Sequence, residues 1–563
     1  MSIDYFTYHG KYLQNQPSIK QYALNFVLLK KNSFMQIEKI KRTNTTYFSK
    51  TANDLVYNQA DLSKFIEAPF TLEEFKNQIQ KKASNFSNNH RKVLVDQLTE
   101  QHKDFADLTV VQDNIQSLSN ENTFTVTSGH QLNLYGGPLY VAYKITHVIQ
   151  LAKKLKETYP ENNFIPVFWM ASEDHDFEEI NHINLFNDKI SWNSNKTGAV
   201  GRFELDDITD FKNELLEKFS NNEAFSAYLN SFYSKEDQNL STATRRFILD
   251  LFGDHGIVTV DGDAKELKQL FVPVVKQELE TGFSGEAVSK TTELLLEEGY
   301  KDQVHPREIN LFYLSEGSRE RIIKKENGSY IAGEKSWRKD EIFQELESNS
   351  ERFSPNVILR PVYQETILPN LSYLGGGGEM AYWLQLKGVF DQLELTFPLI
   401  AVRNSIQIFD GISLKKMEKL NLEPKALFKS IHENKKQFVL EQDEEELDFS
   451  EIESVGEELT SKMEQLVSKV DKSLEGFAKS ESVKINKQME HLKKKLIRHQ
   501  KKQHDDAMNQ IENLYERLFP RNGLQERFET IIPLLAKFGK EETIKMLFEC
   551  VDPFEKDLIL VKF

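Results

Sequence analysis

The sequence predicts an α/β protein whose core is a Rossmann-like parallel sheet, with a small inserted module and a long helical coiled coil. Three observations support this prediction. A strand, a helix and a second strand follow one another within residues 123–171, as in a βαβ unit. Apolar residues recur with coiled-coil spacing over roughly 446–519. Hydrophobic residues make up 39% and charged residues 28%, which is typical of a folded chain.

Length, charge and cysteine content narrow the possible classes of protein. A chain of 563 residues is too long for one compact core, so several structural units are expected. The net charge of −16 would repel phosphate backbones, so we expect no nucleic-acid partner. No apolar run approaches the ~20 residues of a membrane span and no signal-peptide pattern is seen, so a cytoplasmic protein with no membrane partner is expected. The single cysteine, Cys550, excludes an internal disulfide and a cysteine-rich zinc site.

The first half of the chain contains a helical arm and the beginning of the sheet. Residues 1–120 are predicted to be a mostly helical arm, and 121–280 the first part of the Rossmann-like core. Thr123–Thr127 alternates as a strand does, and Pro138 suits the first position of the helix that follows. Phe164–Ala171 is apolar on both alternating faces, which is typical of a central parallel strand.

The remainder of the core is predicted to be split by an insertion. Further strands are expected at 257–260, 357–359 and 399–402. Residues 281–350 contain short strand-like pieces and are expected to form the small inserted α+β module. The second part of the core is then 351–410.

A helical coiled-coil domain is predicted over 411–530, and 531–563 is expected to return to the core. Acidic residues are dense over 441–458 and basic residues over 484–502, so antiparallel pairing would set one charge against the other. The sequence does not decide whether this pairing occurs within one chain or between two. A solvated helix face with an acidic neighbour explains the basic run better than nucleic-acid or membrane contact.

Four polar clusters follow predicted strands, and ligands of open parallel sheets bind beyond the carboxyl ends of the strands. In the first cluster, His130 and Gln131 end a strand, and Gly136 and Gly137 lead into a helix N-terminus that favours an anion. Lys144, further along that helix, could reach a phosphate or a carboxylate. The alternative is a tight turn that simply requires glycine.

The second cluster directly follows the most apolar strand and is rich in ionisable groups: Glu173, Asp174, His175 and Asp176. These groups could provide a general base and acid, or bind an ammonium group. If residues 175–182 were helical, His175, Glu179 and His182 would share a face, so a metal site is conceivable. The alternative is a helix cap with solvated acidic residues.

The third cluster contains a run of glycines at a predicted helix start, where a ligand can approach the backbone closely. It consists of Arg360, Gly375, Gly376, Gly377, Gly378, Glu379, Tyr382 and Trp383. It matches neither the Walker A pattern nor a dinucleotide fingerprint, and a flexible hinge is the alternative.

The fourth cluster is Arg403 with Asn404 and Ser405, directly after the strand at 399–402. An arginine at that position commonly meets a phosphate or a carboxylate, and a structural ion pair is the alternative.

At these residues the chain resembles the cysteine-adding enzymes of bacillithiol biosynthesis, along nearly its whole length. The most specific match is the segment Trp169 to Asp176, with Trp-x-x-x-Glu-Asp-His-Asp. The family more often has Thr-Gly-Gln-Gln where this chain has Ser-Gly-His-Gln at 128–131, and fewer glycines at 375–378. The other matching positions are Gly136–Tyr140, Tyr143, Lys144, Pro166–Val167–Phe168, Phe177, Glu379, Tyr382, Trp383, Pro398, Arg403, Leu518–Phe519–Pro520 and Leu524–Arg527.

The resemblance implies a nucleotidyltransferase-type Rossmann core and a coiled coil used in dimerisation, so a homodimer is expected. It also implies a ligase that joins the carboxylate of L-cysteine to the amine of glucosaminyl-malate, the last step of bacillithiol biosynthesis. Because amide formation from a free carboxylate is uphill near neutral pH, ATP with Mg is the expected cofactor.

These expectations assign roles to the four clusters. The expected catalytic residues are Glu173, Asp174, His175 and Asp176, and no resident metal is expected. The expected substrate-binding residues are Gln131, Tyr140, Arg360, Glu379, Tyr382, Trp383, Arg403 and Asn404. The expected cofactor-binding residues are His130, Gly136, Gly137, Lys144, Gly376, Gly377 and Gly378. The hypothesis requires that 128–144, 172–182, 360–379 and 403–405 meet around a single pocket on one rim of the same sheet.

The alternative function is a non-catalytic nucleotide-binding scaffold that dimerises through its coiled coil. A tRNA-charging enzyme of the same fold is less favoured, because the sequence lacks His-x-Gly-His and Lys-Met-Ser-Lys-Ser segments.

Overall fold

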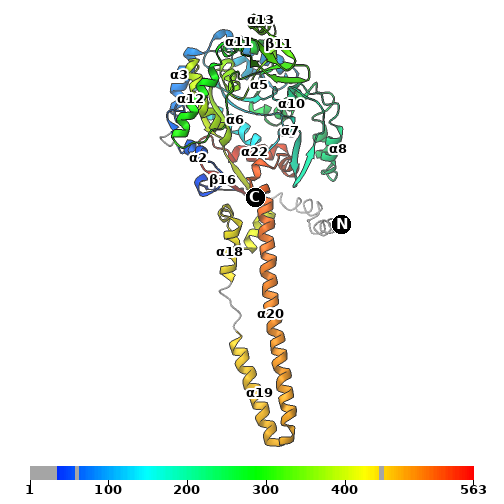
Figure 1. The fold of residues 1–563 in the computed structure, drawn as a ribbon. Helices are drawn as coiled ribbons and strands as arrows, with labels where there is room; N and C mark the ends of the chain where they lie inside the picture. The colour runs from blue at the N-terminus through cyan, green and yellow to red at the C-terminus, as the bar shows by residue number, and fades with distance from the viewer. Residues whose placement is uncertain (1–34, 58–61, 443–448) are drawn as a thin grey trace. The chain divides into compact units, whose positions relative to one another are not determined.

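The computed structural model describes residues 35–57, 62–442 and 449–563 (Figure 1). These residues form two compact units. The first, called here the Rossmann unit, contains the described residues up to Ile408 together with Gly523–Val561. The second, called here the hairpin unit, contains Phe409–Asn522. Part of the predicted N-terminal arm, 1–34 and 58–61, lies outside the described residues.

The core of the Rossmann unit is a five-stranded sheet in the order β14-β13-β2-β3-β6, and all neighbouring strands in it are parallel. This confirms the predicted Rossmann-like core. Because the strands are parallel, their carboxyl ends lie at one edge of the sheet, called here the carboxyl edge. The strands are β2 (Thr123–His130), β3 (Asn163–Met170), β6 (Val258–Asp261), β13 (Asn370–Gly375) and β14 (Leu399–Val402).

The strand predicted at 357–359 is wrong, because Leu359 begins a helix, α14 (Leu359–Ile367). Asn356 Oδ1 accepts hydrogen bonds from the N–H groups of Ile358 and Leu359, in the turn that leads into this helix. The strand that the sequence did not reveal is β13. Its residue Asn370 is polar but fully buried, and Asn370 Oδ1 accepts from the hydroxyls of Thr125 and Thr127 in β2.

Helices surround this sheet. The predicted helix after β2 is α6 (Tyr140–Thr158), and Pro138 lies just before it, in a bridge with Thr530. The predicted helical arm contains the helices α3 (Glu74–Asn85) and α4 (Asn88–Gln101). The other α-helices of this unit are α2 (Lys50–Val56), α5 (Thr109–Ser117), α7 (Phe177–Ile180), α8 (Thr209–Glu217), α9 (Glu223–Asn230), α10 (Leu240–Phe252), α11 (Lys265–Thr281), α12 (Phe283–Glu297), α13 (Lys339–Ser348), α15 (Gly377–Gln385), α16 (Lys387–Gln392), α21 (Ile532–Phe538) and α22 (Lys540–Cys550).

Smaller sheets complete the Rossmann unit. The segment 311–314, predicted to be a strand of the inserted module, is part of β7 (Leu311–Ser315). This strand pairs with β8 (Ser318–Arg321) and β12 (Phe353–Pro355). The remaining strands are β1 (Gln36–Ile40), β4 (His182–Leu185), β5 (Asp188–Ser191), β9 (Ile323–Lys324), β10 (Tyr330–Ala332), β11 (Lys335–Trp337), β15 (Ile406–Phe409) and β16 (Leu558–Lys562).

The hairpin unit contains the predicted coiled coil. Its two longest helices are α19 (Ser450–Val470) and α20 (Glu475–Leu518), which lie side by side after a tight connection (Figure 1). Lys493 of α20 forms an ion pair with Glu453 of α19, so acidic and basic residues pair as expected, within one chain. Residues 443–448 of the acidic run lie outside the described residues. The unit also contains α17 (Gly411–Lys419) and α18 (Ile431–Gln442). No helix in the described ranges is long and apolar enough to cross a membrane.

Candidate active site

A buried ion pair lies at the carboxyl edge between α6 and α15. Lys144 is only 1% exposed, and its Nζ lies 2.5 Å from Glu379 Oε2 and donates to the carbonyl of Gly129 at 2.8 Å. Glu379 also accepts from the N–H of Gly376 (2.8 Å) and the hydroxyl of Tyr373 (3.1 Å). Burial alone would raise the pKa of Glu379, but Lys144 and the Gly376 amide outweigh burial and hold that pKa below its ordinary value. Glu379 is therefore a fixed carboxylate.

A neutral imidazole lies beside this pair. His130 ends β2, and its Nε2 lies 3.3 Å from the hydroxyl of Tyr140. Burial and then the nearby charge of Lys144 lower the pKa of His130 to about 3, so its ring is uncharged near neutral pH. Arg403 follows β14 and places its guanidinium 4.7 Å from the centre of the Tyr140 ring, and it pairs with Glu526 at 2.8 Å.

Arg360 joins the same group of side chains from α14. Its guanidinium donates to Gln364 Oε1 (3.0 Å) and to the hydroxyl of Tyr382 (3.4 Å), and it lies 5.6 Å from the centre of the Tyr373 ring. Trp383, in contrast, is fully buried and stacks on Tyr373 with ring centres 4.5 Å apart. Asn404 is also fully buried, and its N–H donates to His147 Nδ1. The structure thus places Trp383 and Asn404 in the packed interior.

The acidic run after β3 forms a second cluster at the carboxyl edge. Glu173 forms an ion pair with Lys268 of α11, which is 2% exposed. Burial raises the pKa of Glu173 despite this lysine. Asp174 accepts from Gln131 Nε2 and from the N–H of His175, both at 2.8 Å. Asp176 directly precedes α7 and is exposed.

Arg319 fixes the orientation of His175. It comes from β8 and donates from Nη1 to His175 Nδ1 (3.0 Å), from Nε to Ser354 Oγ (3.2 Å) and from Nη2 to the carbonyl of Pro355 (2.9 Å). Since a guanidinium can only donate, Nδ1 of His175 must accept, and the ring proton is therefore on Nε2. Neither Arg319 nor Lys268 could be found from the sequence, because each lies far from the acidic run in the chain and no local motif marks it.

Gln131 joins the two clusters. It follows His130, and its Nε2 donates to Asp174 Oδ2 (2.8 Å) and to Glu179 Oε2 (2.7 Å). Residues that follow β2, β3, β13 and β14 lie at one rim of the sheet. The single pocket that the hypothesis required is not seen among the described residues, because one pocket is lined by Gly376–Gly378 with Arg403, another by Gly136 with Gly137, and the acidic run lines neither. The arrangement combines fixed carboxylates, a neutral imidazole and guanidinium groups, which can bind amino and acidic groups and move protons.

Two family models together match the chain from residue 35 to residue 563 apart from residue 405. The model described as "Bacillithiol biosynthesis BshC, N-terminal Rossmann-like domain" matches residues 35–404, and the model described as "Bacillithiol biosynthesis BshC, C-terminal coiled-coil domain" matches 406–563. The chain belongs to the BshC family.

Proteins of the BshC family named "Putative cysteine ligase BshC" are similar to nearly the whole chain. The one from Flavobacterium psychrophilum is 42% identical over 541 residues, which cover 94% of this chain and 100% of the relative. The one from Flavobacterium johnsoniae is 40% identical over 531 residues, with the same two coverages. A more distant one from Bacillus cytotoxicus is 30% identical over 474 residues, covering 80% of this chain and 86% of the relative.

In this BshC-family chain, Gly136 and Gly137 lie in apolar surroundings. They line a small recess together with Phe247 and Ile531, and both have positive φ angles, of 78° and 66°. The N–H of Leu139, at the start of α6, donates to the carbonyl of Glu529 at 2.7 Å. These contacts fit a turn that requires glycine better than a phosphate-binding loop.

The helix on which the metal hypothesis depended is not formed. α7 contains only Phe177–Ile180, and His182 begins the strand β4. His175, Glu179 and His182 therefore do not share one helix face. Across the part of the chain that the structure describes, no three His, Cys, Asp or Glu side chains are grouped closely enough to hold a metal ion.

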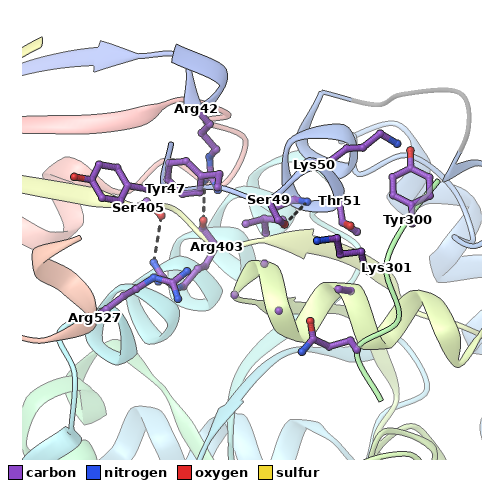
Figure 2. Close-up of a pocket in the computed structure, with 18 of the residues that line it drawn as sticks. Arg42, Tyr47, Ser49, Lys50, Thr51, Tyr300, Lys301, Arg403, Ser405 and Arg527 are labelled. Atoms are coloured by element: carbon purple, nitrogen blue, oxygen red, sulfur yellow. Dashed lines mark hydrogen bonds between the residues drawn. The ribbon is translucent and has the colours of Figure 1, made fainter. Parts of the chain in front are cut away.

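Gly376, Gly377 and Gly378 occupy a different environment from the first glycine pair. Together with Arg403 they line a pocket of about 510 Å³ in the Rossmann unit (Figure 2). Because Arg403 also touches Tyr140, this pocket adjoins the polar groups of the carboxyl edge.

Proposed function

We propose that this BshC-family protein is a ligase that joins the carboxylate of L-cysteine to the amine of glucosaminyl-malate, the last step of bacillithiol biosynthesis. The names of its relatives support a cysteine ligase. The observation that carries the proposal is Gln131, which follows His130 in the chain and donates to Asp174 and Glu179 of the acidic cluster, so the two polar clusters are neighbours at the carboxyl edge. A scaffold protein would gain nothing from so many partly buried ionisable groups, because desolvating charge is costly.

ATP is the proposed source of free energy, with magnesium carried by the nucleotide. Formation of an amide from a free carboxylate is unfavourable near neutral pH, so the carboxylate of cysteine must first be activated. The N-terminus of α15 beside Arg403 has the chemistry to bind phosphate groups. Lys144 is buried and paired, so we assign it to holding Glu379 in place rather than to a phosphate.

The remaining groups have distinct proposed roles. Asp174 and Glu179 orient Gln131, and the carboxylates of this cluster attract the amino groups of the substrates. His175 presents Nε2–H and can donate a hydrogen bond to an oxygen that gains negative charge during the reaction. Arg360 is available for the acidic groups of glucosaminyl-malate, and Arg403, which is paired with Glu526, adds positive charge beside them.

The test is a direct assay with the full-length protein. Incubation with ATP, L-cysteine and glucosaminyl-malate is expected to give the amide, detected by mass spectrometry, together with consumption of ATP. Release of AMP would indicate an acyl adenylate, and release of ADP an acyl phosphate. Omitting ATP should stop the reaction. Absence of both amide formation and ATP consumption would contradict the proposal.

We also propose that the coiled coil forms a homodimer. The two-helix hairpin leaves many large apolar side chains exposed, which is unfavourable for an isolated hairpin in water. A second copy of the same hairpin would cover them. The exposed residues include Val455, Leu459, Leu466, Val470, Leu474, Phe477, Leu492 and Leu496.

A charge placed on this apolar surface should separate the two copies. The double variant Leu466→Glu/Val470→Glu is expected to elute as a monomer in size-exclusion chromatography with light scattering, while the wild type has twice the chain mass of 65.5 kDa. Lys469→Glu, a charge change at an exposed neighbouring position of α19, is the control and should leave the dimer intact. A monomeric wild type would refute the proposed dimer.

A further inference from the structure

A basic pocket adjoins the proposed active site within the Rossmann unit (Figure 2). It has a volume of about 510 Å³, which is enough for a small-molecule ligand or a large part of one. Its walls include three chain segments: 47–52 at the start of α2, 299–303 after α12, and 376–378 at the start of α15. None of the sequence motifs identified the first two of these segments.

The charged side chains that line the pocket are all positive. Five cationic side chains line it and no Asp or Glu does: the five are Arg42, Lys50, Lys301, Arg403 and Arg527. Lys50 pairs with Asp54 at 3.4 Å, and Arg403 pairs with Glu526 at 2.8 Å. Within the described ranges, no carboxylate lies at ion-pair distance from the other three. A pocket with this excess of positive charge attracts anions.

Arg42 shows that the excess charge is built into the interior. It is fully buried, and it donates from Nε to the carbonyl of Lys556 (2.8 Å) and from Nη2 to the carbonyl of Arg403 (2.9 Å). Its third nitrogen, Nη1, is buried and has no hydrogen-bond partner among the described residues. Burying a charge is costly, so an anion in the adjoining pocket would stabilise Arg42 through the attraction between the two charges, without a direct hydrogen bond to Nη1.

The glycines at the start of α15 add backbone donors to the pocket. α15 has nine residues, and Gly376 at its N-cap has no side chain that could accept from the first N–H groups. A side chain at Gly378 would meet nothing within 4 Å, so the backbone here is open to a ligand. The free N–H groups and the helix dipole both favour negative charge at this point.

We propose that this pocket binds a compact anionic group with at least two negative charges. Two molecules of the proposed reaction share this chemistry: the malyl dicarboxylate of the acceptor and the polyphosphate of ATP. The choice between them rests on the proposed function, whereas the anion site itself does not. Arg403 belongs both to the pocket and to the carboxyl edge, so an anion bound here is held beside the reacting groups.

Titration calorimetry on the full-length protein tests the pocket without turnover. Malate and tripolyphosphate are titrated separately, with acetate as a singly charged comparison. At least one dianion or polyanion is expected to bind, and acetate to bind much more weakly. Lys301→Gln and Arg527→Gln, both at exposed positions, should each weaken that binding about tenfold, as expected for loss of one charge-assisted contact. Lys92→Gln, an exposed lysine on α4, is the matched control and should bind like the wild type.

The outcomes separate the two sources and the two proposals. Binding of malate that depends on Lys301 and Arg527 assigns the pocket to the acceptor, and binding of tripolyphosphate with the same dependence assigns it to the nucleotide. Failure of both anions to bind, or binding unchanged in both variants, would overturn the anion site. Because the titration needs no catalysis, a protein that makes no amide but binds an anion here would refute the proposed function and leave the pocket standing.

Discussion

Replacing Glu379 by glutamine is expected to lower the free energy of unfolding by about 3 kcal/mol and to abolish amide formation. The substitution removes the negative charge that faces Lys144, which is 1% exposed and is left with neutral acceptors such as the Gly129 carbonyl. An uncompensated charge in the interior costs more than the pair contributes. We place the loss at the low end for a buried pair because Glu379 itself is 26% exposed. Chemical denaturation of both proteins measures the difference.

The pH dependence of this difference follows from the lowered pKa of Glu379. A carboxyl whose pKa is lower in the folded state than its ordinary value of 4.5 contributes stability that is fully present above pH 4.5. That contribution is lost as the pH falls through the folded-state pKa. The stability gap between the wild type and Glu379→Gln should therefore be constant near neutral pH and shrink in acid.

A matched control uses an ion pair of the same chemistry at the surface. Glu286 and Lys290 of α12 pair with both side chains largely exposed, so Glu286→Gln should leave stability and activity unchanged. If Glu379→Gln behaved like Glu286→Gln, the Lys144–Glu379 pair would have no structural importance and its assignment here would fail. If its stability fell but amide formation persisted in the folded protein, Glu379 would have a structural role alone.

The helices and strands that could be predicted are those whose hydrophobic pattern matches their surroundings in the folded protein. β3 is apolar on both faces because it lies in the middle of a covered parallel sheet, so its sequence alone was sufficient. β13 lies in the same sheet but contains the buried polar residues Asn370 and Ser372. Asn370 accepts hydrogen bonds from the hydroxyls of Thr125 and Thr127, and the hydroxyl of Ser372 donates to the carbonyl of Leu399. These partners are far away in the sequence and come close only in the folded chain. The hydrophobic pattern of this segment therefore does not identify it as a buried strand.

The residues of the candidate site also fall into two groups, those that could be predicted from the sequence and those that could not. Gln131 and Asp174 could be selected because each directly follows a predicted strand, and parallel strands place their ends together. Lys268, Arg319 and Arg42 could not, since each reaches its partners through a contact between segments far apart in the chain. Gly136 and Gly137 share their pattern with phosphate-binding turns, and only the apolar neighbours seen in the structure distinguish the two cases.

The second large effect is expected at His175. Replacement by alanine should lower kcat of the proposed reaction by about 10²–10³-fold, the usual consequence of removing one donor that faces a developing negative charge. KM should change much less, because that donor acts mainly in the transition state. His175→Gln keeps an N–H donor near the position of Nε2 and should recover part of the lost rate. Steady-state kinetics with saturating ATP and cysteine measure each value.

Arg319 is proposed to act through His175, as a positioning residue. Arg319→Lys keeps a positive charge near Asp174. A lysine ammonium cannot replace the planar guanidinium, which donates three hydrogen bonds at once, to His175, Ser354 and the Pro355 carbonyl. If the guanidinium of Arg319 contributes by holding His175 in its Nε2–H form, Arg319→Lys should lower kcat nearly as much as His175→Ala. Adding it to His175→Ala should then cost little more, since coupled residues are not additive. Independent, multiplying losses in the double variant would instead show that Arg319 contributes through its charge, and the tautomer argument would be wrong.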